Sequence, residues 1–207
     1  MVTFSKIEIK DLIISIIVIT LLFAYIYSNG TWDMFIILIP ITLVTVGLSF
    51  ILHELGHKIT AQHYGFFAEF RKWNYGLILA VITAFMGFIF LAPGAVYIGP
   101  YTGFISDREN GIISVAGPLI NIILAVLFLG IGLIIQPYVT LNNMLMIYLA
   151  LTCSIGFHIN SFLALFNLLP IPTLDGSKVM KWNIPLWLTT IIISGILTFI
   201  SRTITFF

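Results

Sequence analysis

The sequence predicts an all-α polytopic membrane protein, with about five to six transmembrane helices and a re-entrant or short β-hairpin segment near residues 77–107. Three observations support this class. Of the 207 residues, 60% are apolar and 8% are charged, whereas soluble domains carry about 25% charged residues. The few charges leave gaps long enough for helices of ~20 apolar residues, which a bilayer core of roughly 30 Å requires. Glycines and prolines interrupt a sixth apolar run, as they do in turns.

The composition also excludes several classes of protein. So apolar a chain is neither an ordinary cytosolic globule nor a disordered segment. Nine Lys or Arg residues against eight Asp or Glu leave no basic surplus for binding nucleic acid. The single cysteine, Cys153, provides neither a disulfide framework nor a cysteine-based metal site. Glu8 and Asp11 interrupt the basic start, so we do not expect a cleaved signal peptide.

Five apolar stretches are long enough to cross a membrane as helices. They lie within the uncharged runs over residues 12–32, 34–53, 110–174 and 182–201, the second continuing a short way into a polar motif. In chain order, the predicted spans are Leu12–Tyr27, Met34–Leu55, Ile112–Ile135, Met144–Leu168 and Ile184–Ile200.

For the sixth apolar run, residues 77–92, the residue pattern alone does not distinguish between three arrangements. Glycines and prolines flank it and aromatic or β-branched residues fill it, so a spanning helix, a re-entrant segment and a hairpin all fit. If residues 77–107 enter and leave on one face, eight of the nine Lys or Arg residues lie on the side of the N-terminus. If the run spans instead, the split becomes six against three. Because basic residues collect on the cytoplasmic side, we favour re-entry and a cytoplasmic N-terminus.

A metal-binding pattern stands at the end of the second predicted span, in the sequence His53-Glu54-Leu55-Gly56-His57. Residues four apart lie on one face of a helix, so the two imidazoles can reach one ion. Glu54 lies one step round the helix and can act on a water molecule at that ion. Ionisable residues in an apolar helix are functional by default. The alternative is a structural metal site or a hydrogen-bonded trio without catalysis.

A catalytic zinc ion usually has three protein ligands, so a third residue is needed besides the two histidines. His63 lies about 120° off the face of His57, while His158 lies inside an apolar span and Cys153 fits a buried apolar position. Asp175 is the better candidate, because two prolines directly before it prevent regular helix. Membranes tolerate such unwound backbone around a site. The alternative for Asp175 is an ordinary solvated turn.

Together, two motifs resemble the signatures of the site-2 protease family of intramembrane zinc metalloproteases. The HExxH signature occurs at residues 53–57 and the NxxPxPxLDG signature at residues 167–176. A third segment, Ala116-Gly-Pro-Leu-Ile-Asn121, resembles the small-residue segment before the middle core helix of that family. The resemblance covers most of residues 34–180. Since no segment is long enough for an appended soluble domain, we expect residues 1–207 to form one transmembrane metalloprotease domain with this core.

The resemblance also implies roles for individual residues. His53, His57 and Asp175 match the ligands of one Zn²⁺ per chain, and Glu54 matches the catalytic acid and base. Asn167 matches a residue that holds the substrate backbone, although a helix-to-helix hydrogen bond is its alternative role, as it is for Asn121. The region 88–97 lies where family members carry strands that pair with an unwound substrate. This chain has a longer apolar run there and no room for a PDZ or CBS domain.

The expected function is therefore that of a zinc metalloendopeptidase that hydrolyses peptide bonds within or near transmembrane segments. Its expected partners are transmembrane protein substrates and the lipid bilayer. We expect the protein to be located in the cell membrane, which it crosses several times, with its active site toward the cytoplasm. Two alternatives from other classes remain: a catalytically inactive zinc-binding scaffold, and a zinc transporter, which needs several metal sites along a path.

Overall fold

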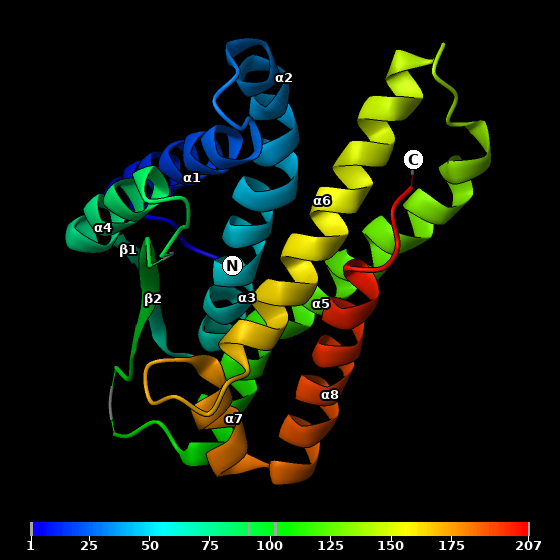
Figure 1. Cartoon of the computed structure of the whole chain (residues 1–207). Coiled ribbons are helices and arrows are strands. Elements are labelled where there is room, and N and C mark those ends of the chain that lie inside the picture. Colours follow the sequence, from blue (N-terminus) through cyan, green and yellow to red (C-terminus); the bar gives the residue numbers. More distant parts are fainter. Residues whose placement is uncertain (1, 91, 102, 207) are drawn as a thin grey trace.

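The computed structural model describes residues 2–90, 92–101 and 103–206, so Leu91 and Thr102 of the predicted re-entrant segment lie outside the described residues. Within this part, five helical segments are long and apolar enough to cross a membrane (Figure 1). They are α1 (Lys6–Tyr27), the continuous run of α2 (Trp32–Thr42), a π-helical segment (Leu43–Gly47) and α3 (Leu48–His63), then α5 (Asp107–Ile135), α6 (Met144–Asn167) and α8 (Ile184–Ser201). Each of the five predicted spans lies in one of these helical segments.

The predicted short β-hairpin is present, but it begins earlier than expected, because its first strand precedes residue 77, and a helix separates its two strands. Strands β1 (Phe67–Lys72) and β2 (Gly94–Gly99) pair antiparallel, with Lys72 opposite Gly94. The apolar helix α4 (Asn74–Phe85) lies between them in the sequence. Because the two strands meet where α4 begins and where the chain returns, the apolar run goes out and comes back to one place.

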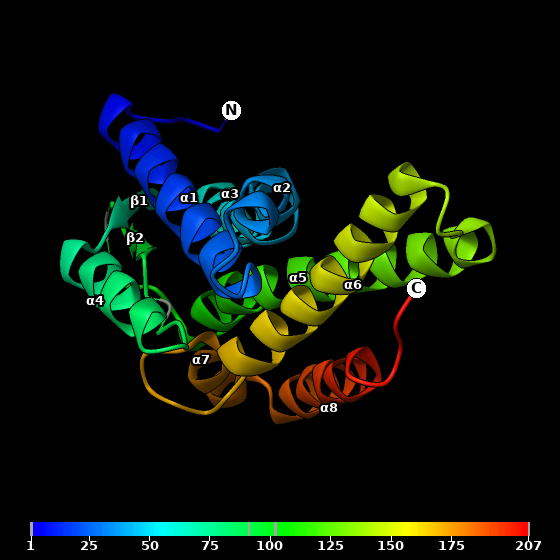
Figure 2. The ribbon, with the colours of Figure 1, turned by 45° about the horizontal axis from the view of Figure 1, so that its top comes forward.

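Helix α4 lies alongside α1, as the two ribbon views show (Figures 1 and 2). At one end, the Lys72 backbone N–H donates to Asp11 of α1 at 3.3 Å. At the other end, the rings of Tyr25 and Phe85 lie 5.3 Å apart between their centroids. Helix α1 therefore provides a surface on which apolar side chains of α4 can pack.

Helix α5 lies at the centre of the molecule, where it contacts α3, α6 and α7 (Asp175–Trp182). The crossing of α3 and α5 is close because Gly56 faces α5 without a side chain. A Cβ atom at Gly56 would lie 3.2 Å from the Ala116 backbone and 2.6 Å from Ile120. Small residues let membrane helices approach in this way. The crossing brings the histidine-bearing face of α3 directly against α5.

The stretch before Asp175 is non-helical, as its two prolines predict. It turns the chain back after α6 and ends where α7 begins, at Asp175. The turn is tight at Gly176, where a Cβ atom would lie 2.0 Å from the Leu168 carbonyl oxygen. The same carbonyl oxygen accepts a hydrogen bond from the Trp187 indole at 2.8 Å. This turn carries the start of α7 to the crossing of α3 and α5 (Figure 1).

Cysteine labelling tests the path of the re-entrant segment. In a Cys153→Ala background, Tyr64→Cys and Phe104→Cys flank the segment at exposed positions, and Leu141→Cys lies in the α5–α6 loop. We expect a membrane-impermeant thiol reagent to label the first two from one face and Leu141→Cys from the opposite face. Labelling of Tyr64→Cys and Phe104→Cys from opposite faces would show that α4 crosses the membrane.

Candidate metal centre

His53 and His57 lie one turn apart on α3, and Asp175 joins them from the start of α7. The two Nε2 atoms are 3.1 Å apart. The Asp175 Oδ2 atom lies 3.4 Å from the Nε2 atom of His53 and 3.2 Å from that of His57. All three residues are buried, with exposed fractions of 6%, 7% and 9%. Among the described residues this is the group whose side chains could jointly hold a metal ion.

The distances between the three ligand atoms fit a tetrahedral metal ion. Ligand bonds of about 2.0–2.1 Å, as at a zinc ion, place neighbouring ligand atoms of a tetrahedron roughly 3.3 Å apart. Two imidazole nitrogens and one carboxylate oxygen also form a donor set found at catalytic zinc sites. Gly117 of α5 leaves space beside these atoms, because a Cβ atom there would lie 2.5 Å from His57 Nε2 and 2.6 Å from His53 Nε2.

Hydrogen bonds to α5 orient both imidazoles. His57 Nδ1 lies 2.8 Å from the Ile113 carbonyl oxygen, which can only accept, so the nitrogen donates. His53 Nδ1 lies 2.5 Å from the Asn121 Oδ1 atom and donates to it. With both protons on Nδ1, the Nε2 lone pairs are free to face a metal ion. Such contacts behind the ligands fix the tautomer and the ring orientation.

A buried chain of amides supports the Asn121 contact. The Asn121 Nδ2 atom donates to Asn160 Oδ1 of α6 at 3.0 Å. Asn160 in turn donates to Ser49 Oγ of α3 at 2.9 Å. The chain links α3, α5 and α6 and sets which side of the Asn121 amide faces His53. Sequence reasoning assigned Asn160 no role, although an asparagine inside an apolar span was a signal for one.

The Asp175 carboxylate divides its two oxygens between two partners. Oδ2 faces the imidazoles, while Oδ1 lies 3.8 Å from the Lys178 ammonium one turn along α7. Burial by itself would raise the pKa of this carboxyl group, but without a metal ion the protonated forms of His57 and His53 outweigh burial, through their charge and their hydrogen bonds to Asp175, and hold the pKa well below its usual range. A metal ion in the same place acts in the same direction. The carboxylate is therefore held in the form that binds a cation.

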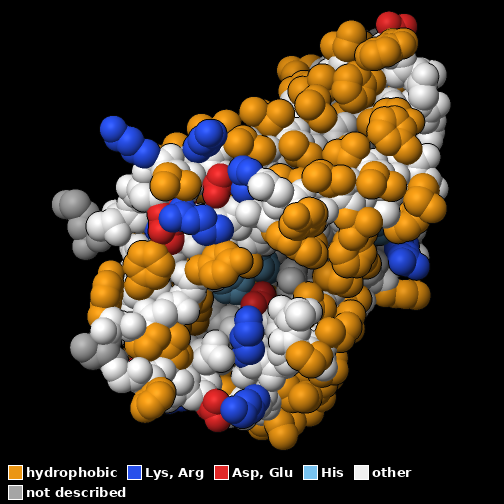
Figure 3. All heavy atoms as spheres, turned by 90° about the vertical axis from the view of Figure 1, so that its left-hand side faces the viewer, with side chains coloured by type: hydrophobic (Ala, Val, Ile, Leu, Met, Phe, Trp, Pro, Cys, Tyr) orange, Lys and Arg blue, Asp and Glu red, His pale blue; other side chains and the backbone are white. Residues whose placement is uncertain are grey.

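Glu54 lies beside the histidines and contacts the sheet. Its side chain is 8% exposed, and its Oε2 atom accepts a hydrogen bond from the Val96 backbone N–H of β2 at 3.1 Å. On the face seen in Figure 3, histidine and acidic side chains lie at the bottom of a hollow, with a basic side chain next to them. The carboxylate therefore lies between the candidate metal ligands and the edge of β2.

The other candidates for the third ligand lie elsewhere. His63 packs against Tyr64 at the end of α3, and His158 Nδ1 lies 3.1 Å from Ser201 Oγ at the contact of α6 with α8. Cys153 is buried in an apolar cluster. Asn167 is not a ligand candidate, and its amide donates to a carbonyl of its own helix at 2.9 Å. Asp175 is the predicted candidate that the fold brings to the histidine pair.

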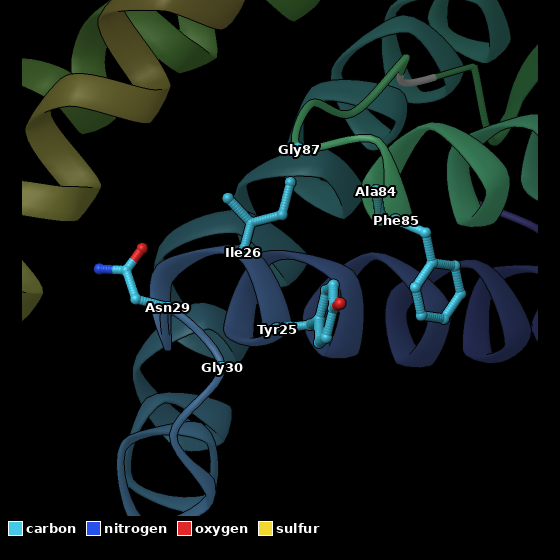
Figure 4. A pocket seen from close by; sticks show the side chains of 7 residues that line it. All are labelled: Tyr25, Ile26, Asn29, Gly30, Ala84, Phe85 and Gly87. Atoms are coloured by element: carbon cyan, nitrogen blue, oxygen red, sulfur yellow. The ribbon is translucent and has the colours of Figure 1, made fainter.

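A separate pocket of about 300 Å³ lies between the ends of α1 and α4. Figure 4 shows Tyr25 and Asn29 on the α1 side and Phe85 and Gly87 on the α4 side. Among the described residues, those that line it include no histidine, cysteine, aspartate or glutamate. The pocket therefore offers none of the groups that the metal centre brings together.

Filling the space at Gly117 tests the metal centre. We expect Gly117→Ala to lower the bound metal at least about tenfold, because the new methyl group lies against both Nε2 atoms. Alanine is a better helix former than glycine, so α5 itself is not weakened. Gly130→Ala, on the same helix with open space around it, should keep full metal content. Equal metal content in the two variants, measured by atomic spectroscopy, would contradict the site.

Removing the Asn121 amide tests the orientation of His53. We expect Asn121→Ala to weaken metal binding about 10–100-fold, because His53 loses the partner of its Nδ1 proton. Asn167→Ala should bind metal as tightly as the unchanged chain, since its amide bonds to its own helix. Competition with a chromophoric chelator measures both affinities. An unchanged affinity for Asn121→Ala would show that this contact does not support the ligand.

The chain is similar to several curated proteins. It is 45% identical over 185 residues to a Methanocaldococcus jannaschii protein named "Putative zinc metalloprotease MJ0611", a match that covers 89% of this chain and 88% of that protein. It is 31% identical to Bacillus subtilis "Putative zinc metalloprotease YwhC", over 72% of this chain and 71% of that protein.

A more distant match is "Putative zinc metalloprotease Rip2" of Mycolicibacterium smegmatis, 33% identical over 65% of this chain and 53% of that protein. No protein-family model and no solved structure matches the chain. The match to the Methanocaldococcus protein spans nearly the whole of both sequences. The chain therefore belongs to the zinc metalloprotease family that these relatives represent.

Proposed function

We propose that this protein is an intramembrane zinc metalloendopeptidase of the site-2 protease type. It hydrolyses peptide bonds within or near the transmembrane segments of membrane protein substrates. The observation that carries this proposal is the meeting of His53, His57 and Asp175, with Glu54 beside them, inside a bundle of apolar helices. The names of the relatives support the metalloprotease class.

In this proposal, His53, His57 and Asp175 hold one zinc ion per chain. When bound, the ion supplies a Lewis acid that polarises the scissile carbonyl group and activates water. Glu54 takes the proton of the attacking water and passes it to the leaving amine nitrogen. Burial of the Glu54 carboxylate beside the ligands keeps it close to the reacting atoms.

The proposed substrate is a transmembrane helix that unwinds locally, because an intact helix hides its carbonyl groups in hydrogen bonds. An extended segment can add to a free strand edge. We propose that β2 offers this edge, since its Val96 N–H already donates to Glu54. Asn167, at the end of α6 before the non-helical turn, is proposed to hold the substrate backbone.

We further propose that the protein lies in the cell membrane with this site toward the cytoplasm. Support comes from the charge distribution, since the favoured arrangement puts eight of nine Lys or Arg residues on that side. A zinc transporter would need several metal sites along a path. The described residues contain one such group, which does not favour transport.

Glu54→Gln in the purified protein tests the proposed chemistry. We expect zinc content to stay near one ion per chain, because Glu54 is not among the three ligands. Cleavage of a single-span helical substrate in liposomes should fall by about 10²–10⁴-fold, the usual contribution of a general acid and base. Gel and mass-spectrometric analysis of the products measures the rate.

Glu109→Gln is the matched control, because glutamine also serves in the capping box at the start of α5. It should cleave at the unchanged rate. A chelator should abolish cleavage by the unchanged protein, and added zinc should restore it. If Glu54→Gln cleaves as fast as the control, the proposed mechanism is wrong. If the zinc-loaded unchanged protein cleaves no helical substrate, the scaffold alternative gains support.

A further inference from the structure

A buried ion pair outside the metal centre joins three elements of the fold. Glu8 of α1 and Lys58 of α3 have exposed fractions of 0% and 1%. Lys58 directly follows the candidate ligand His57, but its side chain contacts α1 and β1. The proposed mechanism uses neither residue. Two buried charges in an apolar bundle are costly unless they are fully paired.

The Lys58 ammonium is fully paired. It donates to both Glu8 carboxylate oxygens at 2.8 Å and to the Ala68 carbonyl oxygen of β1 at 2.9 Å. These acceptors match the three protons of an ammonium group. Glu8 Oε1 also accepts from the Phe70 backbone N–H at 2.9 Å. The pair therefore fixes α1, α3 and β1 relative to one another.

These contacts occupy one edge of β1. The Ala68 carbonyl oxygen and the Phe70 and Lys72 N–H groups belong to alternate residues, and alternate residues of a strand point to the same edge. Glu8, Lys58 and, one turn along α1, Asp11 bind these three groups. This edge faces away from β2, so α1 and α3 cover the outer side of the hairpin.

Because β1 and β2 are paired in a fixed register, contacts that hold β1 in place also determine the position of β2. Phe70 lies opposite Val96, so the Val96 N–H points away from β1, where Glu54 accepts it. The position of β2 against the catalytic carboxylate thus depends on the position of β1. That position depends in turn on directed bonds from Glu8 and Lys58. Apolar contacts alone would fix the position of β1 along its own direction less strictly, because they have no preferred direction.

We propose that Glu8 and Lys58 are positioning residues that set the register of β2, and therefore of the substrate, against the metal centre. This inference rests on the proposed function. The pair selects which peptide bond of an unwound substrate lies at the site of hydrolysis. Loss of the pair lets β2 and the substrate shift along the strand direction, while the metal ligands on α3 and α7 stay in place.

The double variant Glu8→Leu/Lys58→Met tests this role. It removes both charges together, so it leaves no uncompensated buried charge. We expect it to fold and to bind one zinc ion per chain. Cleavage of a defined helical substrate should spread over neighbouring peptide bonds, and KM should rise about tenfold as backbone contacts to β1 are lost. The kcat for total cleavage should change less than KM.

A second double variant, Glu8→Gln/Lys58→Met, keeps a carbonyl oxygen that can accept from the Phe70 N–H. It should cleave within a narrower range of bonds than the leucine variant. Asp107→Asn/Lys181→Met is the control, because it removes an exposed ion pair between α5 and α7. The control should cleave at the unchanged bond. Product masses give the cleavage sites in every case.

Hydrogen exchange supplies a measurement that does not need activity. In the leucine variant, amides of residues 67–72 should exchange about tenfold faster, while those of α5 and α6 should not change. If the leucine variant fails to fold, the glutamine variant is judged by the same criteria. A folded, zinc-loaded double variant with the unchanged cleavage bond, KM and exchange overturns the positioning role. Failure of the unchanged protein to cleave any helical substrate refutes the proposed function instead.

Discussion

The close crossing of α3 and α5 is the constraint on which the rest of the structure depends. Gly56 and Gly117 have no side chains at the point where the two helices meet, so the histidine-bearing face of α3 lies directly on α5. Because α5 is then within reach, Ile113 and Asn121 can accept the Nδ1 protons of His57 and His53. The same contact leaves room beside the Nε2 atoms. Larger residues at this crossing would separate the ligands from the groups that orient them.

Charged residues are few in this chain, and two sets of buried polar contacts link its elements. Asn160 connects the orienting amide to Ser49, and the Glu8–Lys58 pair connects α1 and α3 to β1. In an apolar surrounding, a polar group with a partner is directional, whereas apolar packing is not. These contacts therefore specify the relative positions of elements that apolar packing alone would leave less defined.

The sequence predicted the five apolar helices and the excursion near residues 77–107, because apolar length and turn residues are local signals. It predicted Asp175 as the third ligand from the two prolines before it, from the favoured topology and from the resemblance of its motif, not from local spacing. Helices α1 and α3 extend beyond the predicted spans. Helix α3 continues past Leu55 to His63, and its buried Lys58 pairs with Glu8. Helix α1 begins at Lys6, before Leu12, and its first turns carry Glu8 and Asp11, which accept hydrogen bonds from β1. These pairings join residues 50 to 62 positions apart, which no periodicity in the sequence reveals.

The central claim is that two imidazoles and one carboxylate of this chain hold a single metal ion. X-ray absorption at the zinc edge of the purified, zinc-loaded protein tests it most directly. The account predicts nitrogen or oxygen neighbours at about 2.0–2.2 Å, with the outer-shell scattering of two histidine rings that disappears for one ring in His57→Ala. A sulfur neighbour at about 2.3 Å, which Cys153 would supply, or a spectrum without histidine scattering, would contradict the account.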